Sequence, residues 1–259
     1  MLLAATVLPL EGSGAPAPEH VRGWFYRLIR ELSPSLHDIQ QLKPFTLSVL
    51  ESDPPAIRIT FMDERLHAAS SPKLWGLVGQ ELQLGSASYR VCAVLEQDHP
   101  WARLSSYPRL FHGGPEQDYP MRFVTPTLFK RHGAHYPLPE PRLVFGSLLA
   151  RFKAFAPVTT PASLPESIER LTLRYAHIRT HSIEHATRAV GFTGRTVYHL
   201  PNASEDEARW LTALWRFAFF AGVGAKTTLG FGQVKPYLSR PKPRVAKEDA
   251  NGSGGEQDS

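Results

Sequence analysis

The sequence of 259 residues contains a single cysteine, Cys92. One cysteine excludes a disulfide framework, a cysteine-based zinc site and an iron–sulfur cluster, and it fits a reducing compartment such as the cytoplasm. Cys92 stands between Val91 and Ala93 in an apolar stretch. We therefore expect it to be an inert side chain in the core.

Long apolar runs are also missing. No run approaches the roughly 18 residues that a membrane-spanning helix needs. The stretch from Leu2 to Leu10 is apolar, but no Lys or Arg precedes it and Glu11 follows it. This pattern predicts a strand rather than a signal peptide. We expect a cytoplasmic protein with no membrane partner.

The positive charge is concentrated in one part of the chain. Residues 1–118 carry 10 Lys and Arg against 13 Asp and Glu, whereas residues 119–238 carry 15 against 7, a net charge of +8. Concentrated positive charge favours a polyanion such as nucleic acid, because binding releases condensed counterions. An ordinary solvated basic surface would have the same composition, and charge alone leaves both interpretations open.

The first half of the chain alternates strands and helices. After the first strand, Pro18 begins a helix whose apolar residues follow a helical spacing, and strands are predicted at 45–50 and 57–61. A short helix is predicted near 74–78, and a hairpin at 81–95 turns at Gly85-Ser86. This order is close to the βαββαβ order of a ferredoxin-like fold.

The stretch from Trp101 to Asp118 is rich in Pro, Gly and Ser and predicts a domain boundary. Beyond it, strands are predicted at 121–124, 171–177, 189–200 and 232–237, with helices at 142–155 and after Ser204, where Glu207 completes a capping box. We predict an α+β protein with two tandem ferredoxin-like (RRM-like) domains at 1–115 and 119–238. The polar tail 239–259 is predicted to be disordered.

The segment from Gly222 to Gly232 has four glycines in eleven residues. It is not a Walker A loop, because Ala225 stands where the glycine before the lysine is required, and the segment follows a helix instead of preceding one. Thr227 occupies the third glycine position of a G-x-G-x-x-G motif, which excludes that motif as well. Glycines of this density let the backbone approach a ligand closely.

In its full context this segment resembles the C-terminal signature of the RAMP superfamily of CRISPR systems. More narrowly, the chain resembles the CRISPR repeat-processing endoribonucleases of that superfamily. The glycine-rich end is the most specific part of the resemblance, and the other stretches support it. The stretches that carry it are 37–50 with Lys43-Pro44-Phe45, 122–129, 141–155, 191–194 and 211–234.

The resemblance implies two ferredoxin-like domains and metal-independent cleavage of CRISPR precursor RNA within its repeats, leaving a 2′,3′-cyclic phosphate and a 5′-hydroxyl. The implied partner is CRISPR repeat RNA, as precursor and product, with a homodimer or a CRISPR effector complex as further possibilities. No cofactor and no metal are expected. The main alternative is a non-catalytic RNA-binding RAMP subunit of an effector complex. A purely structural module is disfavoured by the +8 charge of residues 119–238.

Such a reaction needs a base for the 2′-hydroxyl, an acid for the leaving 5′-oxygen and a cation for the phosphate. Histidine suits the first two roles because its ordinary pKa is about 6.5. By the resemblance, the catalytic residues are His37 after the first helix, Lys43 six residues later as the phosphate cation, and Tyr26 as a helper. His20 is the second choice among the histidines, and an ordinary exposed loop histidine is the alternative interpretation of His37.

For the remaining candidate residues, the sequence predicts either a structural role or RNA binding. His177, His181 and His185 have a spacing of four, but a loop or strand end explains them better than a metal site. Trp210 and Trp215 are expected in the core, because they lie on an amphipathic helix. The predicted RNA-binding residues are Gly222, Gly224, Lys226, Thr227, Thr228, Gly230 and Gly232 in the glycine-rich segment, and Arg122, Lys130, Arg131, Arg151 and Lys153 elsewhere.

Overall fold

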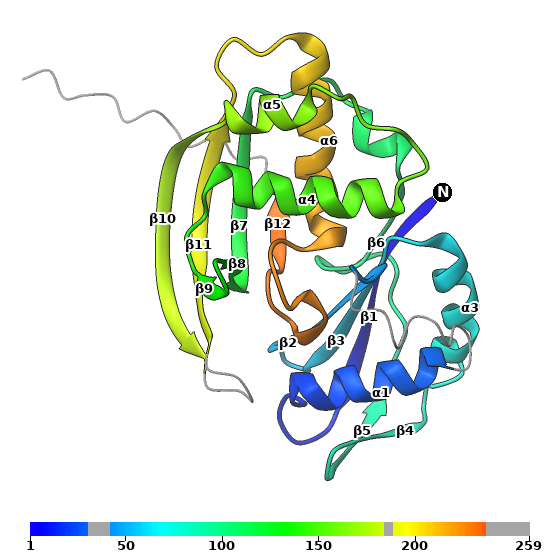
Figure 1. The fold of residues 1–259 in the computed structure, drawn as a ribbon. Coiled ribbons are helices and arrows are strands. Elements are labelled where there is room, and N and C mark those ends of the chain that lie inside the picture. Colours follow the sequence, from blue (N-terminus) through cyan, green and yellow to red (C-terminus); the bar gives the residue numbers. More distant parts are fainter. Residues whose placement is uncertain (31–41, 184–188, 237–259) are drawn as a thin grey trace, which may run out of the picture.

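A computed structural model describes residues 1–30, 42–183 and 189–236. The described residues form two main antiparallel sheets, one from each half of the sequence, and a separate two-stranded sheet, and helices cover one face of each main sheet (Figure 1). The predicted disordered tail 239–259 lies outside the described residues, and so do His37 and His185.

The N-terminal half has the strand order of a ferredoxin-like fold. Its central strand β1 lies between β3 and β6, and β2 is the outer neighbour of β3. A hairpin of β4 and β5 extends the sheet, because β5 pairs with the end of β1 at Leu10 and Glu11. The elements are β1 (Leu2–Glu11), α1 (Pro18–Arg30), β2 (Phe45–Leu50), β3 (Ala56–Phe61), α3 (Glu64–Trp75), β4 (Glu81–Leu84), β5 (Ala87–Val91) and β6 (Arg103–Ser106).

Two predictions for this half were wrong, and one region contains elements that were not predicted. The expected boundary region 101–118 contains β6, whose residues pair with Leu2 to Ala5, and a short 3₁₀ helix η1 (Pro108–Phe111). Helix α3 starts ten residues before the predicted short helix, because Asp63 caps it by accepting a hydrogen bond from the Leu66 amide. Cys92 is exposed, because it continues the alternation of β5, in which Tyr89 and Val91 are buried and Arg90 is exposed.

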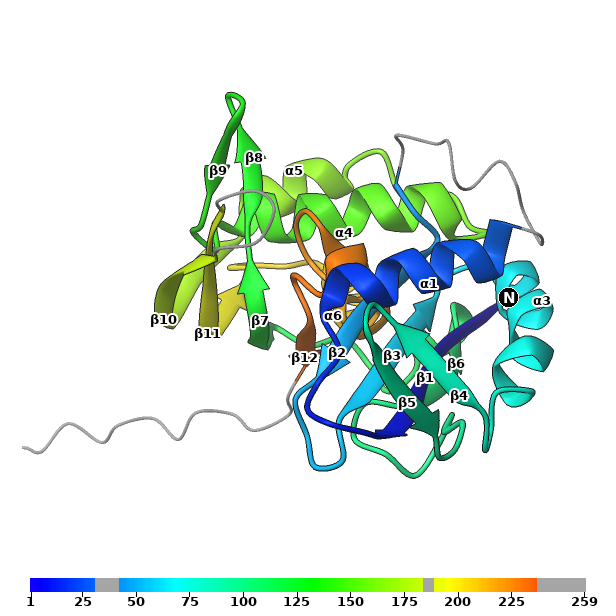
Figure 2. The same ribbon diagram turned by 90° about the horizontal axis from the view of Figure 1, so that it is seen from below.

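The C-terminal half repeats the same order, with β7 between β11 and β12 and with β10 at the far edge. A small hairpin of β8 and β9 projects beyond this sheet (Figure 2). The predicted α+β fold class with tandem ferredoxin-like folds is confirmed. The elements are β7 (Asp118–Thr127), β8 (Phe129–Arg131), β9 (Ala134–Tyr136), α4 (Pro141–Phe155), α5 (Leu164–Glu169), β10 (Thr172–Ile183), β11 (Ala189–His199), α6 (Glu205–Ala221), η2 (Thr227–Leu229) and β12 (Val234–Pro236).

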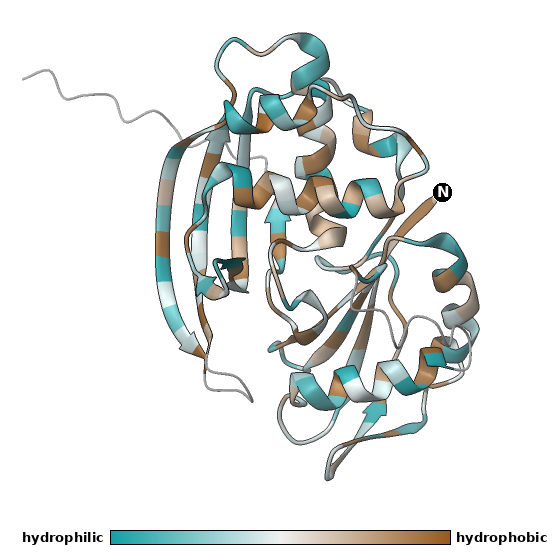
Figure 3. Ribbon diagram, in the orientation of Figure 1, coloured by the Kyte–Doolittle hydropathy of each residue, from teal (hydrophilic) through white to brown (hydrophobic). Residues whose placement is uncertain are grey.

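The largest hydrophobic core belongs to the C-terminal half but does not stop there. It includes Leu3, Ala5 and Met62 from the N-terminal half, together with Tyr107 from the connecting stretch. Apolar residues of α4 and α6 line the inner faces of these helices (Figure 3). The two halves are therefore packed together, and the division into domains at 1–115 and 119–238 stays a prediction.

Helix α6 is nearly surrounded by protein. Trp215 is buried and its ring nitrogen donates to the Pro120 carbonyl at 2.8 Å. Trp210 is partly buried against Phe111 and Phe152. The prediction that both tryptophans serve the core is confirmed. None of the helices in the described residues is long and apolar enough to span a membrane.

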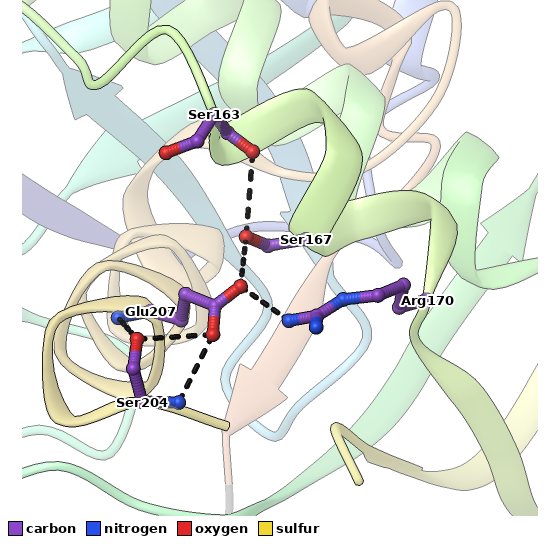
Figure 4. Close-up of polar contacts among 5 residues, drawn as sticks. All are labelled: Ser163, Ser167, Arg170, Ser204 and Glu207. Atoms are coloured by element: carbon purple, nitrogen blue, oxygen red, sulfur yellow. Dashed lines mark hydrogen bonds and ion pairs between the residues drawn. The ribbon is translucent and has the colours of Figure 1, made fainter. Parts of the chain in front are cut away.

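The predicted capping box at the start of α6 is present and extends to a second helix. Ser204 accepts a hydrogen bond from the Glu207 amide, and the Glu207 carboxylate accepts one from the Ser204 amide at 3.0 Å. The same carboxylate accepts from the Ser167 hydroxyl at 2.7 Å and from Arg170, both on or next to α5 (Figure 4). The hydrogen bonds from Ser204 and Ser167 lower the pKa of Glu207 from 4.5 to about 2.

A carboxyl group with a lowered pKa stabilises the fold above its ordinary pKa of 4.5, and this stabilisation is lost as the pH falls toward 2. At pH 7, Glu207→Gln should lower the free energy of unfolding by about 1 kcal/mol, because the amide can still cap the helix but its hydrogen bonds lose the stabilisation that the carboxylate charge provides. The difference from wild type should shrink between pH 4.5 and 2 in urea titrations. Glu205→Gln, in the same exposed turn, is the control and should have little effect. A difference that persists at pH 2 would contradict this account of the carboxylate.

Candidate functional site

A cavity of about 770 Å³ lies where the two halves of the protein meet. The N-terminal half contributes α1 and the segment before β2, and the C-terminal half contributes β8, α4 and the glycine-rich segment. None of the lining residues that the structure describes is acidic, so this part of the cavity has a concentrated positive charge that suits a polyanion. Its basic lining residues are Arg22, Lys43, Lys130, Arg142, Arg151 and Lys226.

The wall from the N-terminal half contains two predicted catalytic residues. Tyr26 is buried on α1, its ring packs edge-on against Phe45 at 5.6 Å, and it reaches the cavity. Lys43, two residues before β2, lines the same cavity. Arg22 stands one helical turn before Tyr26, with its guanidinium 5.4 Å from the centre of the Tyr26 ring. The fold thus brings Tyr26 and Lys43 to the same cavity, although they are 17 positions apart in the sequence.

The opposite wall is the glycine-rich segment, which α4 holds from behind. The Ser147 hydroxyl accepts a hydrogen bond from the Gly224 amide at 3.2 Å, and Arg151 donates to the Gly224 carbonyl at 2.9 Å. The next amide, of Ala225, donates to the Leu128 carbonyl at 2.8 Å. Ser147 and Arg151 are one turn apart on α4, so a single helix face fixes both polar groups of Gly224.

Two of the glycines are required by the packing of the segment itself. A Cβ atom on Gly224, whose φ is +79°, would lie 2.4 Å from the Leu128 carbonyl oxygen. A Cβ atom on Gly232, with φ of +69°, would lie 1.9 Å from the Val223 carbonyl oxygen. The sequence argument attributed these glycines to close approach of a ligand, whereas these contacts account for glycine at both positions without one.

Arg151 supports the segment from inside the protein. Its side chain is buried and also donates to the Thr227 hydroxyl at 3.1 Å, and burial lowers its pKa to about 10. Lys226 precedes η2 with a left-handed backbone (φ 59°), and its ammonium lies 5.9 Å from the centre of the Phe231 ring. A left-handed backbone is uncommon for a lysine, and a role of Lys226 in RNA binding stays a prediction. Thr228 lines the cavity beside it.

The projecting hairpin of β8 and β9 is attached to the start of α4 by one carboxylate. Glu140, the residue before α4, accepts hydrogen bonds from Tyr136, from Arg131 at 3.1 Å and from Arg142 at 3.0 Å. The hydrogen bond from Tyr136 is the main cause that lowers the pKa of Glu140. Arg131 is therefore held beside the cavity, which its neighbour Lys130 lines.

Two predicted binding residues lie elsewhere. Arg122 is exposed on β7, in register with Arg195 on β11 and Lys235 on β12, so it belongs to the open face of the C-terminal sheet. Lys153, near the end of α4, is exposed and lines a different pocket with the chain that follows the helix. A direct role in binding stays a prediction for both.

Two of the three histidines that were considered as possible metal ligands lie on an exposed strand. His177 and His181 both belong to β10, and His181 is hydrogen-bonded to the Thr193 hydroxyl at 2.8 Å. Within the part of the chain that the structure describes, no three His, Cys, Asp or Glu side chains gather as a metal site would require. His20, the second-choice histidine, is exposed at the start of α1 and is not among the residues that line the cavity.

Sequence reasoning missed three residues of this site. Arg22 and Arg142 line the cavity, and Ser147 binds the Gly224 amide. The spacing of Arg22 and Tyr26, one turn apart on a predicted helix, was a signal that could have found the first. Nothing in the sequence distinguishes Ser147 from other polar residues on α4.

Comparison with known proteins supports the resemblance to CRISPR repeat-processing endoribonucleases. The family model described as CRISPR-associated endoribonuclease Cas6 matches residues 121–234. The Cas6 endoribonuclease of Mycobacterium tuberculosis H37Rv is 32% identical over 147 residues, which are 54% of this chain and 46% of that protein. The chain therefore spans about half the length of the curated relatives it matches.

Solved structures match over nearly the whole described chain. A Cas6 in a product complex is 48% identical with a TM-score of 0.88, and the match covers 92% of this chain and 100% of that one. A Thermus thermophilus Cas6 is 32% identical with a TM-score of 0.75, covering 91% and 98%. The chain belongs to the Cas6 family of CRISPR-associated proteins, which confirms the predicted relationship.

The contacts of Gly224 predict a difference between two alanine substitutions at positive φ. Gly224→Ala should destabilise the protein by about 1–3 kcal/mol more than Gly14→Ala, because only the first places a methyl group against a backbone carbonyl. Gly14 has a similar φ of +72° with no atom within 4 Å of the added Cβ, so it controls for backbone strain alone. Urea unfolding of both variants measures the difference. Equal losses of stability in the two variants would mean that the glycine-rich segment moves away from Leu128 at no cost in free energy.

Proposed function

We propose that this protein is a metal-independent endoribonuclease that cleaves CRISPR precursor RNA within its repeats. The 2′-hydroxyl attacks the adjacent phosphate, and the products carry a 2′,3′-cyclic phosphate and a 5′-hydroxyl. One observation carries the proposal: among the described residues, six basic side chains and no acidic one line a cavity between the two halves. Tyr26 and Lys43 lie on one wall of this cavity, and the glycine-rich segment forms the other. Family membership supports it, and so do the product and substrate-mimic complexes of relatives that are 47–48% identical.

The positive walls would hold the RNA backbone. Lys226, Lys130 and Arg142 line the cavity from three separate elements of the C-terminal half, a spread that suits successive phosphates of a strand. Each phosphate that is neutralised releases counterions, so affinity should depend strongly on salt. Arg151 contributes differently, since its described contacts are with Gly224 and Thr227, and it keeps the segment in shape.

The chemistry would come from the N-terminal half. Lys43 is a compact cation on the wall opposite Lys226 and would stabilise the charge that develops on the phosphate oxygens. Tyr26, one turn from Arg22, would orient the phosphate or the 2′-hydroxyl. We assign proton transfer to His37, which lies outside the described residues but is six residues from Lys43 in the sequence. A histidine-to-alanine mutant among the solved relatives, 48% identical to this chain, supports the choice of a histidine.

A labelled repeat RNA incubated with the protein in EDTA tests the activity. We expect cleavage at one position, a 2′,3′-cyclic phosphate on the upstream product, and no cleavage when the nucleotide before the cut has a 2′-deoxy sugar, because the nucleophile is then absent. Cleavage of the deoxy substrate, or a requirement for magnesium, would refute the mechanism. Binding without any cleavage would favour the alternative, a non-catalytic RNA-binding subunit.

The assignment of His37 predicts a specific kinetic defect. His37→Ala should slow single-turnover cleavage about 10²- to 10⁴-fold, the usual contribution of a general acid or base. RNA affinity should change little, because a neutral imidazole adds little to the binding of a polyanion. His20→Ala is the matched control and should cleave normally. If His20→Ala is inactive and His37→Ala is active, the assignment is wrong although the enzyme class stands.

A further inference from the structure

Arg58 is a buried cation that joins the two halves of the protein. It lies on β3, is 1% exposed, and uses three guanidinium nitrogens as donors. One donates to the Trp101 carbonyl at 3.0 Å, a second to the Gln233 side-chain carbonyl at 2.5 Å, and a third to the Phe219 carbonyl at 2.7 Å. Two of these three acceptors, on Gln233 and Phe219, belong to the C-terminal half.

None of the hydrogen-bond partners of Arg58 in the described chain is a carboxylate. Aromatic rings and carbonyl groups surround this cation instead. The guanidinium lies 5.1 Å from the ring centre of Trp101 and 4.6 Å from that of Phe219, so two aromatic faces contact it. The carbonyls of Phe219 and Phe220 belong to the last turn of α6, the negative end of the helix dipole. Thr60, two residues after Arg58 on the same strand, donates to the Phe220 carbonyl at 2.6 Å.

These contacts lie at both ends of the glycine-rich segment. Phe219 and Phe220 come just before Gly222, and Gln233 comes just after Gly232. The Val223 amide donates to the Gly232 carbonyl at 2.9 Å, which closes the segment into a loop. Arg58 therefore binds one residue before that closure, Phe219, and one directly after it, Gln233.

The body of the loop rests against the N-terminal half. A Cβ atom on Gly230 would lie 3.8 Å from the Ser48 Cα on β2, and η2 packs against β2 and α1. Figures 1 and 2 both show the loop beside β2 and α1. Tyr26 belongs to α1, and Lys43 stands two residues before β2, so the attachment of the loop sets its distance from both.

We propose that Arg58 is a positioning residue, which fixes the loop bearing Lys226 relative to the wall bearing Tyr26 and Lys43. The expected effect of Arg58 on cleavage rests on the proposed function. Its expected effect on the position of the loop rests only on its hydrogen bonds. Arg58 does not line the cavity and acts through the residues it holds. Arg216 is a natural control, because it also donates to main-chain carbonyls, those of Leu110, His112 and Gly114, and none of these borders the loop.

The test compares Arg58→Met and Arg216→Met, with Thr60→Val as a milder variant that removes one bond to α6. Spin labels on the native exposed Cys92 and on Arg209→Cys, an exposed position of α6, report the distance between the halves. At a temperature where circular dichroism shows every variant folded, the distance distribution should widen in Arg58→Met and to a lesser degree in Thr60→Val. It should remain unchanged in Arg216→Met.

Single-turnover cleavage of repeat RNA at saturating protein gives the functional readout. Arg58→Met should cleave about 10- to 100-fold more slowly, because small misplacements of reacting groups have effects of that size. Its RNA affinity should fall much less, and Arg216→Met should cleave at the wild-type rate.

An unchanged distance distribution in Arg58→Met and Thr60→Val would overturn the inference. So would equal widening in Arg216→Met, because that would indicate a general loss of stability. If the wild-type protein cleaves no repeat RNA, the proposed function fails, while the distance measurement still decides the role of Arg58. If Arg58→Met does not fold, Thr60→Val decides the outcome by the same two measurements.

Discussion

Two carbonyls in the last turn of α6, those of Phe219 and Phe220, accept hydrogen bonds from a strand of the other sheet. Arg58 and Thr60 of β3 supply those donors, and the apolar residues around them merge into a core that spans both halves. A helix end buried without partners would be costly, so these hydrogen bonds constrain how the two sheets can meet. The cavity, the loop and the facing wall all follow from that constraint, because each is built from elements that the junction holds in place.

The cavity combines like charges that would repel one another in the absence of a ligand. Six basic side chains line it, and the carboxylate that partly compensates them, Glu140, is outside the lining and binds Arg131 and Arg142. Burial further disfavours charge on Arg151, whose pKa is lowered to about 10. A phosphate backbone relieves this repulsion on binding, which is the physical reason for proposing RNA as the ligand.

Much of the secondary structure was predictable because its signals are local. The apolar spacing after Pro18, the alternation around Ile57 and the capping box at Ser204 each specify an element from a few neighbouring residues, and the structure contains all three. Strand β6 was missed because its four residues alternate poorly and are held by long-range pairing with β1. Cys92 was misplaced for a related reason, since the apolar run around it continues past the end of β5.

The sequence by itself determined the fold class, the family and the nature of the glycine-rich end, because these depend on local patterns and a recognisable motif. It also predicted Tyr26 and Lys43 as catalytic residues and Lys226 as an RNA-binding residue, and the structure places all three on one cavity. Only the tertiary structure decided that Arg22 and Arg142 share the cavity and that Gly224 is fixed by the Leu128 carbonyl. Only it placed Arg58 at the junction, where its partners are up to 175 residues away in the sequence. Contacts of that separation depend on how two sheets pack, and no local pattern of side chains encodes them.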